Sequence, residues 1–211
     1  MYQPSHFVEA DPAVLLSLIR ARPLATVAIN GEDGPLANHL PLLAVEEDGA
    51  LRLRGHVARA NPLWRLLEAE PQALAVFQGD DAYISPSWYP AKAEHGKVVP
   101  TWNYMVAHAR GRLRAVDDPI WLRGLLDQLT RVQEAGFPLP WQVADAPADY
   151  LDKMLRAIVG IELTVSRLDG KYKLSQNQDE ATRQSVRAGL AGSGDARARA
   201  LAGEMARRQK P

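Results

Sequence analysis

Short runs in which apolar and polar residues alternate recur along this 211-residue chain. Alternation with a period of two places the apolar side chains on one face of a β-strand. About seven such strands with few helices indicate a mainly β, α+β fold, a β-barrel with peripheral helices. The strands are expected at residues 24–29, 36–45, 51–54, 73–78, 82–85, 103–116 and 160–168, with turns at 30–34, 46–49 and 169–170.

Helical spacing of apolar residues fills several of the intervals between these runs. A helix should begin at Pro12 after Asp11 and end before Pro23, because Asp caps a helix and proline suits its first turn. By the same reasoning the pair Asn61-Pro62 opens a second helix. The remaining segments are the body of that helix at 63–70, further helices at 119–135 and 148–158, and a long loop with three prolines at 85–101.

The composition changes after Asn177, where Ala, Arg, Gly and Gln predominate. This change predicts a barrel domain over residues 1–177 and a C-terminal extension over 178–211. The extension forms either a helical tail of two helices broken at 192–194 or a partly disordered segment, and both interpretations stay open.

The net charge and the residue composition exclude several classes of function. The 25 basic and 25 acidic residues cancel, so the total charge does not favour a nucleic-acid partner. Only the extension, with seven basic and two acidic residues from Thr182 onward, could contact DNA, and it would do so in a salt-sensitive manner. The absence of cysteine excludes disulfides and thiolate chemistry. Without a membrane-length apolar run or a signal-peptide pattern, we expect a cytoplasmic protein and no membrane partner.

The stretch "LRGHVARANP" (53–62) combines cationic side chains with the start of a helix. Arg54, His56 and Arg59 precede the unpaired amide groups of the helix opened by Asn61 and Pro62. Positive side chains beside such amides suit a phosphate group. The alternative is that Asn61 merely caps the helix and the arginines are solvated.

Two proline-rich segments, "YISPSWYP" (83–90) and "VPTWNY" (99–104), place aromatic residues in or near loops. Trp88, Trp102 and Tyr104 could stack on a flat ring, lie at a subunit interface, or simply cover one end of the barrel. Polar residues in "ANHLPL" (37–42) and "KYKLSQN" (171–177) are either ligand contacts or ordinary hydrogen-bonding groups. The sequence contains no G-x-S-x-G motif, no H-E-x-x-H motif and no histidine pair at metal spacing, so redox chemistry would need a bound cofactor.

Five motifs in this order, "MYQPSHF", "LRGHVARANP", "YISPSWY", "VPTWNY" and "KLSQN", resemble the PaiB family of FMN-binding negative transcriptional regulators. The resemblance covers residues 1 to about 190, and no family motif is visible after Leu190. It implies an FMN-binding split β-barrel that forms a homodimer with FMN at the subunit interface. It also implies a role in gene repression.

The resemblance further implies cofactor-binding roles for individual residues. The FMN phosphate would be held by Arg54, His56, Arg59 and Asn61, and the isoalloxazine ring would be lined by Asn38, His39 and Leu40. The aromatic side chains of Trp88, Trp102 and Tyr104 would close the pocket from the partner subunit. From its residues alone, the "KYKLSQN" segment either reaches the ring carbonyls or the phosphate, through Lys171 and Ser175, or forms a solvated turn at the end of a strand.

The sequence is also compatible with two other functions. A flavin-dependent oxidoreductase would use FMN and NAD(P)H on a small molecule, since the same fold serves many tasks. Haem binding would need an axial ligand, for which His39, His56 and His95 are the candidates. No helix-turn-helix pattern supports direct DNA binding.

Overall fold

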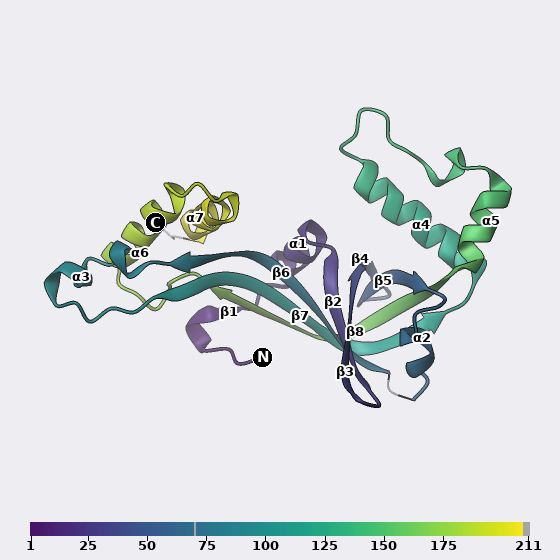
Figure 1. Ribbon diagram of the computed structural model, residues 1–211, viewed down its shortest axis with the longest axis horizontal. Helices are drawn as coiled ribbons and strands as arrows, with labels where there is room; N and C mark the ends of the chain where they lie inside the picture. The colour runs from purple at the N-terminus through teal and green to yellow at the C-terminus, as the bar shows by residue number, and fades with distance from the viewer. Residues whose placement is uncertain (70, 209–211) are drawn as a thin grey trace. The chain divides into compact units, whose positions relative to one another are not determined.

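The computed structural model describes residues 1–69 and 71–208 (Figure 1). Its strands form one eight-stranded sheet, which confirms the mainly β, α+β class. The strands are β1 (Val8–Glu9), β2 (Leu24–Gly31), β3 (Gly34–Pro41), β4 (Leu43–Glu47), β5 (Ala50–Ala58), β6 (Gln72–Ile84), β7 (Thr101–Val116) and β8 (Ile158–Lys173). The helices are α1 (Pro12–Ala21), α2 (Leu63–Leu66), α3 (Ala91–Glu94), α4 (Pro119–Glu134), α5 (Ala148–Arg156), α6 (Glu180–Ala191) and α7 (Ala196–Arg208).

The sheet curls so that distant strands in its order meet. Hydrogen bonding runs in the order β3-β2-β6-β7-β8-β5-β4, with β1 paired to β8. Although β3 and β5 stand far apart in this order, their residues contact each other. That contact gives the sheet the curvature of a barrel.

The chain divides into two compact units. Unit 1 contains residues 1–18, 78–108 and those from 169 onward, and unit 2 contains residues 19–77 and 109–168. This division differs from the boundary expected at 177/178. The C-terminal segment forms two helices, as one of the two interpretations expected, and they belong to unit 1. Their apolar faces are buried there through Val186, Leu190, Leu201 and Met205.

Several strand boundaries expected from the sequence are wrong. The run 36–45 is two strands, because β3 pairs with β2 whereas β4 pairs with β5. The chain changes partner at Leu42, whose amide donates to the Pro23 carbonyl at 2.9 Å. The strand expected at 51–54 continues to Ala58, since residues 52–58 pair with β8. The two runs at 73–78 and 82–85 form the single strand β6.

The turn expected at 169–170 is also absent. Strand β8 runs through it because β1 pairs there, with Glu9 opposite Gly170. A Cβ atom on Gly170 would lie 2.2 Å from a methyl carbon of Leu15, so glycine at this position admits the side chain of α1 rather than a turn. The loop at 85–101 includes the short helix α3 and a 3-10 turn (Pro86–Trp88).

The expected helices are confirmed, with one of them shortened. Asp118 caps α4 by accepting from the amides of Ile120 and Trp121. The helix expected at 63–70 ends at Leu66, and Glu70 lies outside the described residues. Among the described residues no helix is long and apolar enough to cross a membrane, and no group of His, Asp and Glu side chains could hold a metal ion.

Candidate functional site

Unit 2 gathers seven of the residues expected at an FMN site. Strand β3 carries Asn38, His39 and Leu40, and β5 carries Arg54 and His56. The turn after β5 supplies the remaining two, Arg59 and Asn61.

Strand β5 separates its polar and apolar side chains by alternation. Leu53, Gly55 and Val57 are buried on one face, and Arg54 and His56 belong to the other. Packing within the chain requires glycine at position 55, because a Cβ atom there would lie 2.9 Å from the Pro41 carbonyl oxygen. The close approach at this glycine is therefore to the bend between β3 and β4.

Asn61 links the turn after β5 to strand β3. Its Nδ2 donates to Oδ1 of Asn38 at 2.7 Å. Its Oδ1 accepts from the amide of Leu63, the first residue of α2, at 2.9 Å, although the N-cap position itself is Pro62. The two asparagines thus form a fixed amide pair beside β5.

Arg59 is already well supplied with partners. It donates twice to the carboxylate of Asp117, at 2.7 and 2.6 Å, and also to the carbonyls of Arg156 and Ile158. These bonds use four of the five guanidinium N–H groups. Hydrogen bonds from Arg59 lower the pKa of Asp117. Arg59 can reach a phosphate fully only by exchanging Asp117 for it.

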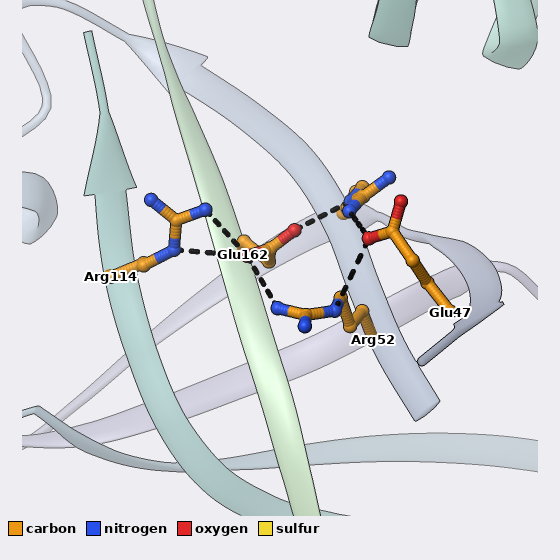
Figure 2. A network of polar contacts seen from close by, with 5 residues as sticks. Glu47, Arg52, Arg114 and Glu162 are labelled. Atoms are coloured by element: carbon orange, nitrogen blue, oxygen red, sulfur yellow. Dashed lines mark hydrogen bonds and ion pairs between the residues drawn. The ribbon is translucent and has the colours of Figure 1, made fainter. Parts of the chain in front are cut away.

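Arg54 belongs to an ion-pair network around Glu162, in which Figure 2 labels Glu47, Arg52, Arg114 and Glu162. The Glu162 side chain on β8 is completely buried, opposite Arg54 in the register of β5 and β8. Arg54 Nε donates to Glu162 Oε2 at 2.6 Å, and Arg114 donates to Oε1 at 2.9 and 2.7 Å. Arg52 lies 3.4 Å from Oε1, and Glu47 pairs with both Arg52 and Arg54. Three guanidinium groups against two carboxylates leave one positive charge in excess.

Glu162 belongs to none of the motifs that predict the site. The ionisation of its carboxyl group depends on the ion-pair network. Burial alone would raise the pKa of Glu162, but hydrogen bonds from Arg54 and Arg114, together with their charge, outweigh burial and lower the pKa. The sequence does contain a signal for this network. Glu162 is a lone carboxylate in the apolar run "GIELTV" (160–165), and two arginines alternate with leucines in "LRLR" (51–54), so the opposite charges could pair.

His56 carries a buried ring nitrogen without a partner. Its Nδ1 is enclosed and makes no hydrogen bond to the described residues. Burial lowers the pKa of His56, so the imidazole is neutral near pH 7. Because buried polar atoms are nearly always hydrogen-bonded, this nitrogen is the feature of unit 2 that most directly indicates a missing ligand.

The other five expected site residues lie in unit 1. Trp88 packs against Gly189 of α6, and Trp102, which is half exposed, meets Tyr83 edge to face at 6.0 Å. Buried Lys171 donates to the Tyr2 carbonyl at 3.1 Å, and its Nζ lies 5.4 Å from the ring centre of Tyr104. Buried Ser175 shares hydrogen bonds with Asn103. Lys171 and Ser175 thus stabilise unit 1 through contacts of their own.

Comparison with known proteins decides the family. Residues 1–167 match the model of a family described as "Putative FMN-binding domain". The chain belongs to this family. It is 32% identical to the "Protease synthase and sporulation protein PAI 2" of Bacillus subtilis, covering 88% of this chain and 87% of that protein. It is 34% identical to the protein AN0679 of Emericella nidulans, over 90% of each chain. The resemblance to the PaiB family is therefore confirmed.

A solved structure supports the fold. The FAD and heme binding protein of Mycobacterium smegmatis superposes with a TM-score of 0.62 at 21% identity, covering 86% of this chain and 80% of that one. This likeness concerns the fold alone.

The cofactor of the family is FMN, and the residues of unit 2 fit such a ligand. FMN presents a phosphate, which needs positive charge and hydrogen-bond donors, and a flat ring with polar edges. Unit 2 offers one excess positive charge around Glu162, the unpartnered Nδ1 of His56 and the amide pair of Asn38 and Asn61. The individual FMN contacts of the twelve expected residues remain predictions.

Proposed function

We propose that this chain is a cytoplasmic, homodimeric FMN-binding regulator of the PaiB type. The observation that carries the flavin part is the buried Nδ1 of His56, which has no hydrogen-bond partner among the described residues. The hydrogen-bonded pair Asn38 and Asn61 in the same unit adds to it. When bound, FMN supplies a redox-active ring. The residues of β3 and β5 orient it, and Arg54, Arg59 and Asn61 hold its phosphate, with Arg59 exchanging Asp117 for it.

Exposed apolar side chains support the dimer. The segment from α4 to α5 in unit 2 leaves Ile120 and Leu139 exposed at 85% and 91%, and Phe137, Trp141 and Tyr150 are also exposed. Helix α5 buries none of its residues although its apolar side chains share one face. Monomeric proteins rarely leave so many large apolar side chains uncovered in one segment. A second copy of the chain would cover them.

The regulator role is supported by the 32% identity to the Bacillus subtilis sporulation protein. The basic C-terminal segment gives little support for direct DNA contact. Arg207 and Arg208 pair with Glu204, and Arg197 lies near Asp81 and Asp195. Paired cations release few counterions from DNA. Lys210 lies outside the described residues.

One pair of assays separates the regulator from the alternative, a flavin-dependent oxidoreductase. Under anaerobic conditions the regulator is expected to keep its oxidised flavin absorbance after NADPH or NADH is added, whereas rapid bleaching would favour the oxidoreductase. A regulator that contacts DNA directly would retain promoter DNA selectively at about 0.2 M salt in an electrophoretic mobility assay. Sequence-independent retention that disappears at this salt concentration would contradict a repressor.

Replacing Arg59 with alanine is expected to weaken FMN binding at least tenfold, which is about 1.4 kcal/mol. The loss follows from removal of a charged phosphate donor, and equilibrium titration with FMN measures it. Arg65→Ala is the matched control, because Arg65 is exposed and stacks on Trp64. Melting temperatures of both variants show whether Arg59→Ala is folded. Equal FMN affinity in folded Arg59→Ala and wild type would remove Arg59 from the site.

A further inference from the structure

Unit 1 contains a pocket of about 460 Å³ that includes none of the β3 and β5 residues described above. Its walls come from the loop around α3, the first residue of β7, the end of β8 and the first turn of α6. Its volume lies within the range of about 300 to 1,000 Å³ that is usual for small-molecule sites. Tyr89, Val98 and Val99 form its apolar part.

Two lysines line this pocket without an acidic partner. The Lys173 ammonium group donates to Oγ1 of Thr101, and no carboxylate among the described residues pairs with it. Lys97 is exposed and forms no ion pair with the described residues. His95 lies beside Lys97, whose amide donates to His95 Nδ1 at 3.0 Å.

The single acidic residue of the pocket lining forms no ion pair with either lysine among the described residues. Asp179 accepts from the amide and the hydroxyl group of Thr182, at 2.8 and 3.0 Å, and so caps α6. Burial lowers the pKa of Lys173, and the nearby charge of Lys171 acts in the same direction. A half-buried ammonium without a counter-ion is costly, and an anion in the pocket would offset that cost.

The backbone around the pocket is held in an unusual conformation. Ser175 has a φ of 63°, in the left-handed region that non-glycine residues seldom occupy. Its buried hydroxyl is fixed by Asn103, and Gln176 bonds back to the amide of Leu174 at 2.6 Å. Such backbone conformations persist where the surroundings hold them, and they cluster at ligand sites.

We propose that this pocket binds the phosphate group of a phosphate monoester through Lys97 and Lys173. The two ammonium groups and the Asp179 carboxylate leave the lining one positive charge in excess, and a phosphate monoester carries about −1.5 to −2 at pH 7. Lysine binds phosphate as a point charge, and the hydroxyl of Thr101 adds a neutral hydrogen bond. The ester is a phosphorylated metabolite other than FMN, since the FMN phosphate is assigned above to Arg54, Arg59 and Asn61.

Calorimetric titration of the full chain with ribose 5-phosphate tests this proposal. Flavin-free wild-type protein is expected to bind with a Kd below about 1 mM, and Lys173→Met and Lys97→Met should each weaken binding at least fivefold. Lys92→Met is the control, because Lys92 lies on α3, bonds to Ser87 and does not line the pocket. Lys97 is exposed, so Lys97→Met remains informative if Lys173→Met fails to fold.

A second titration with saturating FMN identifies the source of the phosphate. Ribose 5-phosphate binding that is unchanged by FMN supports a separate ester in this pocket. Loss of that binding with FMN, but not with riboflavin, would place the FMN phosphate in the pocket and contradict both this proposal and the phosphate site assigned above. The proposal is overturned if wild type binds no ribose 5-phosphate, or if both lysine variants bind it as wild type does. If the chain binds ribose 5-phosphate but not FMN, the function proposed above is contradicted and the proposal for this pocket stands.

Discussion

Replacing Glu162 with glutamine is expected to lower the free energy of unfolding by about 3 kcal/mol, the lower end of the range for breaking a buried ion pair. The glutamine keeps the shape of the side chain but leaves the guanidinium groups of Arg54 and Arg114 without a full negative charge. The lower end applies because the Arg114 side chain is 55% exposed and water can replace part of its interaction. Urea denaturation of the purified chain measures the change.

Glu46→Gln is the matched control. Glu46 pairs with Arg20 at 3.1 Å, and both side chains are more than half exposed. Exposed ion pairs contribute about 0 to 1 kcal/mol, so this variant should unfold nearly as wild type does. Equal losses in the two variants would contradict a special role for the Glu162 network.

The same network predicts how stability depends on pH. Because the pKa of Glu162 is lowered in the folded chain, the unfolded chain binds a proton at this group more readily. The contribution of Glu162 is therefore complete above its unfolded pKa of about 4.5 and disappears as pH falls through the folded value. Denaturation curves of wild type and Glu162→Gln should converge as the pH is lowered below about 4.5. If the difference in unfolding free energy between wild type and Glu162→Gln stayed constant as the pH fell below about 4.5, the lowered pKa of Glu162 would be contradicted.

Replacing Gly111 with alanine is expected to destabilise the chain by at least about 3 kcal/mol. A Cβ atom on Gly111 would lie 1.9 Å from the carbonyl oxygen of Thr164, and 3.1 Å from the Cα of Val165. These obstacles are backbone atoms, so no change of rotamer relieves the collision and β7 must move away from β8. Thermal and urea unfolding of the variant measure the loss.

Gly124→Ala provides a control of opposite sign. Gly124 lies inside α4, and no atom is within 4 Å of a Cβ built there. Alanine is favoured over glycine in a helix interior by about 1 kcal/mol, so this variant should be more stable than wild type. A destabilised Gly124→Ala together with an unaffected Gly111→Ala would contradict the backbone packing described here.

Local patterns in the sequence predicted much of this fold, and long-range pairing accounts for the errors. Asp11 before Pro12 predicts α1 because the cap and the helix are neighbours in sequence. Gly170, in contrast, looks like a turn residue, and its actual partner is Glu9, more than 150 residues earlier. A two-residue strand such as β1 has too few positions for alternation to reveal it.

The candidate site shows the same limit. The pair Asn61-Pro62 predicts the start of α2, and the bond from the Leu63 amide to Asn61 joins residues only two apart. The sequence could not show that Arg59 is held by Asp117, or that Arg54 faces Glu162, since these pairs form only when β5, β7 and β8 come together. The motif "LRGHVARANP" therefore predicts Arg54 and Arg59 as FMN ligands, although part of their role is to hold strands together.

The most direct test of the central claim is an equilibrium titration of the flavin-free chain with FMN and with riboflavin, combined with the mass of the complex in solution. The predicted result is saturation at one FMN per chain, an affinity for FMN at least about tenfold above that for riboflavin, and a mass of two chains. Absence of saturable FMN binding, or equal affinities for FMN and riboflavin, would contradict the phosphate-holding site assigned to β3 and β5.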